Sequence, residues 1–324
     1  MPEFPTRLLF RPETAEQRFL PEGPYPCGDG LLSWVSIQHG TGQTVGSLNL
    51  LDLAAGTNRN VPLPGRPGFA FPTNRDGEFV IGLEREVGLY RIADASWTPL
   101  TETLETDVEN TIVNDGVAFS GGLIFGCKDP NFTDPKAGLY LWRRSDGQTI
   151  KLRSDQVCSN GKVIFGNGDI VTLLDIDTPT KQVVRYSLNV AAGELSERKV
   201  VVDLNSRDDF PDDFPDGMIA TPDRQSVIIA FYHPEQARPV DLGTARQYSL
   251  QDGSLEAVWT VEKSPRVTCP QLVRIDGSVK LILTTADEGM KPEQQARHTN
   301  AGCLFIADTD FTDVPDTPVF QVSE

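Results

Sequence analysis

The sequence predicts an all-β protein, and within that class a six-bladed β-propeller. Short runs of β-branched and aromatic residues recur along the whole chain between Gly, Pro, Asn and Asp residues, while the 3.6-residue periodicity of helices is almost absent. A similar short motif returns about every 50 residues, which is the length of a four-stranded propeller blade. Since 324 residues divided by roughly 52 is close to six, six blades are expected.

The expected strands follow one another from the N-terminal to the C-terminal part of the chain. Each run is four to seven residues long, the length of a strand rather than of a helix. In order, the runs are 31–36, 47–53, 78–83, 122–127, 138–142, 169–174, 183–188, 226–232, 245–250, 279–284 and 302–307. The best candidate for a helix is the short segment 291–298.

The repeated motif places polar residues at equivalent points of different blades. Asn114, Asn160 and Asp216 each stand in an Asn/Asp-Gly motif, at intervals of 46 and 56 residues, and Glu22 occupies the corresponding place near the start of the chain. In a propeller the innermost strand of each blade lines the central channel, so we expect these four side chains to converge there. Because no change in composition marks a boundary, residues 1–324 are interpreted as a single six-bladed propeller domain.

Composition excludes several classes of function. The chain carries 46 acidic against 29 Lys and Arg residues, a formal charge of −17, so nucleic acid and membrane surfaces are not expected partners. No run of 18 apolar residues and no secretory signal can be read. Five widely spaced cysteines without a C-x-x-C motif indicate reduced thiols in a cytoplasmic protein. Nothing predicts an oligomer.

The four converging side chains indicate a metal site. All four present oxygen atoms, and carboxylate and carboxamide oxygens suit hard cations such as Ca²⁺ or Mg²⁺, with Mn²⁺ or Zn²⁺ as alternatives. The three histidines are scattered, which disfavours a histidine-ligated zinc centre. A single Asn-Gly or Asp-Gly pair most often forms only a β-turn. Their common position in the repeat favours a ring of ligands in the channel instead.

Six short motifs in order resemble those of one protein family over almost the entire chain. They are 21–24 (PEGP) with 32–37 (LSWVSI), 114–116 (NDG) with 125–126 (FG), 160–161 (NG), 175–180 (DIDTPT) with 184–186 (VRY), 214–218 (FPDGM), and 284–286 (TTA) with 301–305 (AGCLF). Each motif is weak alone, but together they resemble the SMP-30/gluconolactonase/luciferin-regenerating-enzyme family, which includes regucalcin. The resemblance implies a six-bladed propeller with one divalent cation in its central channel.

The resemblance also assigns roles to individual residues. It implies that Glu22, Asn160 and Asp216 bind the metal, with Ca²⁺ as the first expectation. It implies that Asn114, with Asp115 beside it, contacts the substrate. The implied reaction is metal-assisted hydrolysis of a small lactone, in which Asp216 is also the candidate base that takes a proton from water.

One departure from the family pattern concerns specificity. Where sugar-lactonase members commonly carry an Arg that binds substrate hydroxyls, this chain has Ile112. An apolar wall penalises a hydroxyl that must lose its water, so a less hydroxylated lactone is expected to be preferred to gluconolactone. That expectation weakens if another basic residue, such as Lys128 or Arg266, reaches the same space.

Two other functions stay open at this stage. The same metal site would serve a hydrolase of phosphotriesters or other esters. A non-catalytic propeller that is stabilised by its metal and used for binding is the alternative from another class, because a fold alone does not choose among functions.

Overall fold

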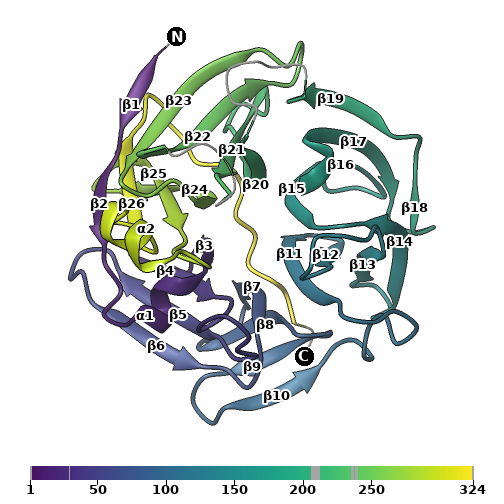
Figure 1. The fold of residues 1–324 in the computed structure, drawn as a ribbon. Coiled ribbons are helices and arrows are strands. Elements are labelled where there is room, and N and C mark those ends of the chain that lie inside the picture. Colours follow the sequence, from purple (N-terminus) through teal and green to yellow (C-terminus); the bar gives the residue numbers. More distant parts are fainter. Residues whose placement is uncertain (1, 29, 206–211, 235–236, 238–239, 323–324) are drawn as a thin grey trace.

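A computed structural model describes residues 2–28, 30–205, 212–234, 237 and 240–322. Within these residues the strands form six sheets, which stand around a central axis like the blades of a propeller (Figure 1). The innermost strand of each sheet contacts the innermost strand of the next, and these contacts close a ring. The predicted six-bladed fold is confirmed.

The first three blades follow the chain without interruption. Blade 1 contains β3 (Pro21–Pro26), β4 (Leu31–Ser36), β5 (Ser47–Asp52) and β6 (Asn58–Pro62). Blade 2 contains β7 (Pro67–Pro72), β8 (Glu78–Leu83), β9 (Glu86–Arg91) and β10 (Ser96–Pro99). Blade 3 contains β11 (Ile112–Phe119), β12 (Gly122–Lys128), β13 (Ala137–Arg143) and β14 (Thr149–Gln156).

The other three blades are less regular at their outer edges. Blade 4 contains β15 (Ser159–Phe165), β16 (Ile170–Asp177), β17 (Gln182–Asn189), β18 (Glu194–Leu195) and β19 (Lys199–Asp203). Blade 5 contains β20 (Phe214–Ala220), β21 (Ser226–Tyr232), β22 (Leu242–Ser249) and β23 (Leu255–Glu262). Blade 6 contains β24 (Val267–Ile275), β25 (Ser278–Thr285) and β26 (Leu304–Asp308).

The N-terminal segment completes the last two blades. Strand β2 (Arg7–Phe10) pairs antiparallel with β26 as the outermost strand of blade 6, and β1 (Glu3–Pro5) adds a parallel strand to β23 of blade 5. Blade 6 therefore combines strands from both ends of the chain. This pairing gives blade 6 its fourth strand and joins the two ends of the chain in one sheet.

Apolar side chains fill the space between blades. Middle strands such as β8 and β21 are buried along nearly their whole length, which explains why they read as continuous apolar runs in the sequence. Aromatic rings pack within blades, as in Phe125–Tyr140 with centroids 5.4 Å apart, and between blades, as in Tyr25–Phe71 with centroids 4.9 Å apart. The blades are thus held rigidly around the axis.

Helical segments are short. They are α1 (Ala15–Phe19), α2 (Pro292–Arg297) and the 3₁₀ turn η1 (Thr178–Thr180). The segment predicted to be helical, 291–298, contains α2. In the described part of the chain, no helix has both the length and the apolar character that a membrane span requires.

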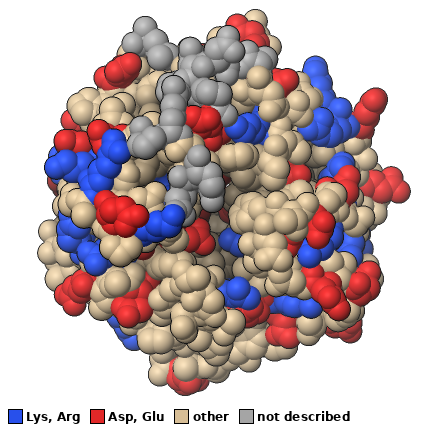
Figure 2. Space-filling view, viewed as in Figure 1, with Lys and Arg blue, Asp and Glu red and all other residues tan. Residues whose placement is uncertain are grey.

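The C-terminal tail, residues 309–322, leaves β26 and runs through the centre of the ring toward blade 2 (Figure 1). There the amide of Phe320 donates a hydrogen bond to the carbonyl of Pro72 (2.9 Å), and Phe320 forms a parallel bridge with Thr73. Around the axis the molecular surface is hollowed, with acidic and basic side chains both near the hollow (Figure 2).

Candidate metal and hydrolase site

The Asn-Gly and Asp-Gly motifs lie inside strands rather than in turns between them. In every one of the six inner strands, the register with the second strand shifts by one residue at the same level. Such a β-bulge inserts one extra residue, bends the strand and redirects its side chains. The bulges begin next to Glu22, Pro67, Val113, Asn160, Pro215 and Val267.

These bulges divide the central channel into two ends. The end at which the inner strands begin is called here the carboxylate end, because Glu22, Asp115 and Asp216 stand at or just before the bulges. The end at which the strands finish is called the tail end, since the C-terminal tail crosses it. Gly161, with a φ of 35°, is one of the bulge residues that needs a conformation favourable to glycine.

The structure brings Asn114 and Asn160 together at the carboxylate end. The Asn114 side-chain amide donates hydrogen bonds to the Asn160 Oδ1 (2.8 Å) and to the carbonyl oxygen of Ser159 (2.9 Å). Asn114 is 5% exposed and Asn160 is 7% exposed. The contact joins β11 of blade 3 to β15 of blade 4 and fixes the orientation of both carboxamides.

A second contact continues this network to blade 5. The Asn160 Nδ2 donates to the Thr178 hydroxyl (2.9 Å), and that hydroxyl donates to the carbonyl of Pro215 (3.0 Å). Pro215 directly precedes Asp216. Three blades are therefore connected beside the candidate ligands, which limits how far these side chains move relative to one another.

Glu22, Asp115 and Asp216 carry unbalanced negative charge. Burial raises the pKa of Glu22 well above its usual range, and repulsion from Asp216 and Asp115 raises it further. Burial likewise raises the pKa of Asp216, and Asp115 and Glu288 add to the rise. Within the described residues, no Lys or Arg forms an ion pair with any of the three carboxylates. The charge of Lys128 lowers the pKa of Glu22 and of Asp216, and that of Lys162 lowers the pKa of Asp115, but these effects are smaller than the effect of burial.

This donor set fits a divalent cation. Buried carboxylates without a cationic partner are costly, and a metal ion supplies the missing charge. In the described part of the chain, no three His, Cys, Asp or Glu side chains group closely enough to hold a metal by themselves. A centre here therefore needs amide oxygens as well, and Glu22, Asn160 and Asp216 together provide both kinds of oxygen.

A buried lysine beside this site was not foreseen from the sequence. Lys162 lies two residues after Asn160 and is 4% exposed. Its Nζ lies 3.6 Å from the Asp175 Oδ1 and 3.2 Å from the Asn160 carbonyl oxygen, while Gln156 donates to the Asp175 Oδ2 (2.6 Å). The only feature of the sequence that could have pointed to Lys162 is its place directly after the Asn160-Gly161 motif.

Ile112, the residue predicted to influence substrate specificity, lies on β11 two residues before Asn114. Its side chain is 4% exposed, so it contributes an apolar wall. Its direct partner on the neighbouring strand β12 is Lys128. The mouth of the site thus has an apolar residue on the inner strand and a basic residue one strand outward.

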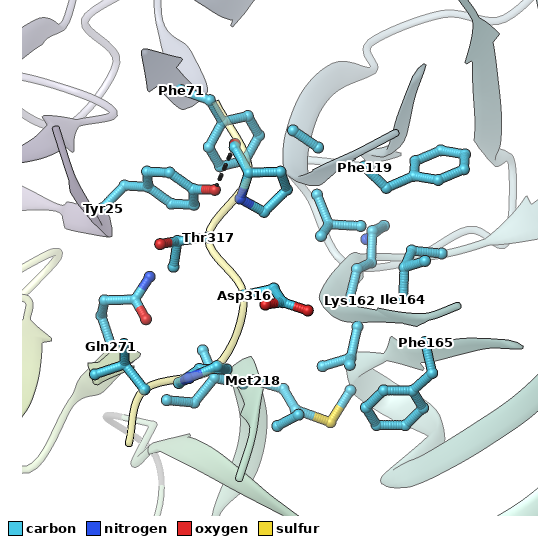
Figure 3. A pocket seen from close by; sticks show the side chains of 18 of the residues that line it. Tyr25, Phe71, Phe119, Lys162, Ile164, Phe165, Met218, Gln271, Asp316 and Thr317 are labelled. Carbon is cyan, nitrogen blue, oxygen red and sulfur yellow. Dashed lines mark hydrogen bonds between the residues drawn. The ribbon is translucent and has the colours of Figure 1, made fainter. Parts of the chain in front are cut away.

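The tail end of the channel contains a cavity of about 760 Å³. Its walls carry apolar side chains from the later parts of the inner strands, among them Phe119, Ile164 and Phe165 (Figure 3). The tail crosses this cavity, and the Tyr25 hydroxyl donates a hydrogen bond to the Pro318 carbonyl (2.8 Å). Asp115 and Lys162 also line this cavity, whereas Glu22, Asn114, Asn160 and Asp216 do not.

Comparison with known proteins gives one family and several related structures. The family model described as "SMP-30/Gluconolactonase/LRE-like region" matches residues 20–287. A Bacillus subtilis (strain 168) protein provisionally named sugar lactone lactonase YvrE is 26% identical over 290 residues, which cover 88% of this chain and 90% of that protein.

Solved structures share the fold at lower identity. A calcium-binding protein, regucalcin, from Agrobacterium tumefaciens strain C58 superposes with a TM-score of 0.77 at 22% identity, covering 98% of this chain and 100% of that chain. A gluconolactonase from Xanthomonas campestris gives a TM-score of 0.62 at 16% identity, covering 93% and 88% of the two chains.

Proposed function

Because the chain belongs to the SMP-30/gluconolactonase/LRE-like family, we propose that it is a divalent-metal-dependent hydrolase of small lactones. The observation that carries this proposal is the group of buried and half-buried carboxylates at the carboxylate end, which lies beside the Asn114–Asn160 contact and forms no ion pair with any described Lys or Arg. The names of the Bacillus and Xanthomonas relatives agree with a lactone substrate.

In this proposal Glu22, Asn160 and Asp216 hold the cation. The name of the regucalcin relative favours Ca²⁺, while Zn²⁺, Mn²⁺ and Mg²⁺ are also compatible with oxygen ligands. When bound, the cation would polarise the lactone carbonyl and lower the pKa of a water molecule. Asn114 and Asp115 would contact the substrate from the adjoining blade.

The remaining chemistry falls to Asp216. Its carboxylate accepts a proton from the attacking water, whose oxygen forms a bond to the carbonyl carbon. The ring C–O bond then breaks, and the leaving oxygen takes up a proton to give a hydroxy acid. Lactone and water are thereby converted into one product, so no second nucleophile such as a serine is needed.

The compartment and the domain organisation are part of the same proposal. All five cysteines are unpaired, which supports a reducing compartment such as the cytoplasm.

The N-terminal strands on blades 5 and 6 and the tail on blade 2 support a single domain over residues 1–324.

A metal-replacement assay tests this function. The protein is treated with EDTA, dialysed, and supplied with Ca²⁺, Zn²⁺, Mn²⁺ or Mg²⁺ before hydrolysis of gluconolactone, δ-valerolactone and a phosphotriester is measured. We expect lactone hydrolysis that disappears with EDTA and returns with a cation. A cation that raises the melting temperature while no lactone is hydrolysed would indicate a binding protein, and hydrolysis of the phosphotriester alone would indicate the other hydrolase class.

A further inference from the structure

Lys128 is fixed between the strands that carry Asn114 and Asn160. It ends β12, where its direct partner on β11 is Ile112. On its other side it forms an isolated β-bridge with Cys158, two residues before Asn160. The backbone of Lys128 therefore lies at the mouth of the carboxylate end, between blades 3 and 4.

The Lys128 side chain extends on the same side of the sheet as Ile112, because directly opposed residues of antiparallel strands share a face. Its bridge partner Cys158 accepts hydrogen bonds through Sγ from the side-chain amides of Asn114 (3.7 Å) and Asn160 (3.6 Å), so Lys128 lies beside the strand that positions both carboxamides. Among the described residues, its ammonium group forms no ion pair with Glu22 or Asp216.

The Lys128 ammonium differs from the Arg266 guanidinium in its contacts with the described residues. Among the described residues it makes no hydrogen bond and no ion pair, and its side chain is half-buried. Arg266, in contrast, donates to the carbonyls of His233 and Glu288 and lies over the Tyr232 ring. Three N–H donors of Lys128 are thus available to a ligand, whereas the Arg266 guanidinium is already engaged.

A hydrogen-bond acceptor, the Glu288 carboxylate, lies on another side of the opening at the carboxylate end. The Tyr232 hydroxyl donates to the Glu288 Oε2 (3.4 Å), and Tyr232 is the direct strand partner of Phe214, two residues before Asp216. Donors from blade 3 and an acceptor from blade 6 therefore flank the candidate ligands. Hydroxyl groups both accept and donate hydrogen bonds, so a hydroxylated ligand can use both sides.

From this arrangement we propose that Lys128 is the substrate-binding cation of the site and selects lactones whose ring carries hydroxyl groups. The inference rests on the proposed lactonase function. Lys128 would take over, from the second strand of blade 3, the role that the family resemblance gives to an arginine at position 112. It reverses the preference expected from Ile112 alone, so gluconolactone becomes a better substrate than unsubstituted δ-valerolactone.

The test compares two lactones of the same ring size. We expect Lys128→Met to lower the ratio of kcat/KM for gluconolactone to kcat/KM for δ-valerolactone by about 10- to 100-fold, the usual range for a hydrogen bond from a charged donor. Lys128→Arg should keep most of the ratio, because it preserves the charge. Lys151→Met, which changes an exposed lysine on the outer strand β14 of the same blade, is the matched control and should leave the ratio unchanged.

A double variant and a binding measurement separate the possible outcomes. Ile112→Arg combined with Lys128→Met should restore part of the ratio, and calorimetry with Ca²⁺ alone shows whether each variant still binds the cation. If Lys128→Met slows both lactones equally, or leaves the ratio unchanged, this inference is overturned while the lactonase function stands. If the cation-loaded wild type hydrolyses neither lactone, the proposed function fails and the inference fails with it.

Discussion

The two ends of the central channel are built from the same six strands, yet they differ in almost every chemical respect. The carboxylate end holds three acidic side chains, two hydrogen-bonded carboxamides and the Lys128 ammonium group, which has no hydrogen-bond or ion-pair partner among the described residues. The tail end holds a cavity of about 760 Å³ that many apolar side chains line, together with polar ones such as Lys162 and Gln271, and the C-terminal tail crosses it. The bulges separate the two ends, because the register of each inner strand changes there.

This difference shows how a repeated strand can serve two purposes. At the bulge, the inner strands of blades 1, 3, 4 and 5 carry the polar side chains of the candidate site, whatever their cost to stability. After it, the same strand needs apolar residues that pack against neighbouring blades. We therefore expect substitutions at the carboxylate end to change activity more than stability, and substitutions at the tail end to change stability more than activity.

The largest effect is expected for Asp216→Asn at the carboxylate end. The substitution removes both a charge from the candidate metal site and the proposed base, so kcat for lactone hydrolysis should fall at least ~10³-fold. Because it also removes a buried charge that repels Glu22, the melting temperature should not fall. Hydrolysis, calorimetry with Ca²⁺ and thermal melting measure the three consequences. A kcat close to wild type would show that Asp216 is neither ligand nor base.

A second prediction concerns the buried pair Lys162–Asp175, which lies at the level where the two ends meet. Asp175→Leu leaves the Lys162 charge buried without its partner and should lower the free energy of unfolding by about 3–5 kcal/mol. Lys162→Met together with Asp175→Leu should recover most of that loss. Chemical denaturation checks both values, and equal stability of the single and double variants would contradict the proposed coupling.

The same pair predicts a pH dependence. Burial raises the pKa of Asp175 to about 6, although Lys162 opposes the rise. The folded state therefore retains the Asp175 proton to higher pH than the unfolded state, so this group's contribution to stability falls as pH rises from about 4 to about 6. Asp175→Asn cannot titrate and should lack this part of the slope. Denaturation curves of both proteins across that range would reveal identical slopes if the interpretation were wrong.

At the tail end, Phe320→Ala should destabilise without inactivating. Phe320 is buried and its ring lies 5.3 Å from that of Trp142, so its loss should cost about 3 kcal/mol. The Phe320 ring lies at the tail end of the channel, whereas the candidate ligands lie at the carboxylate end. We therefore expect kcat/KM to change less than threefold. Melting and kinetics measure the two effects, and a loss of activity larger than the loss of folded protein would link the tail to catalysis.

The smallest effect is expected for Tyr25→Phe, which removes only the hydrogen bond to the Pro318 carbonyl. The free energy of unfolding should fall by about 1 kcal/mol, because such a bond contributes roughly 0.5–1.5 kcal/mol. If Tyr25→Phe costs as much as Phe320→Ala, the hydroxyl rather than the ring at position 320 anchors the tail.

The sequence alone determined the fold class and which residues repeat. All eleven predicted runs correspond to second or third strands of blades, such as β4 at 31–36 and β21 at 226–232. Those strands are covered on both faces, and complete burial leaves a continuous apolar run that can be read locally. The inner strands carry Gly, Pro and polar residues for the channel, so no apolar run reveals them, and only their repeated polar motif does.

Only the tertiary structure decided how the site is completed. The repeat placed Glu22, Asn114, Asn160 and Asp216 in four different blades, but the Asn114–Asn160 contact depends on how two blades are packed. No local pattern pairs Lys128 with Ile112 or buries Lys162 beside Asp175. Secondary structure follows from the order of neighbouring residues, whereas these contacts depend on strand register and on the angle between blades, which the whole closed ring fixes.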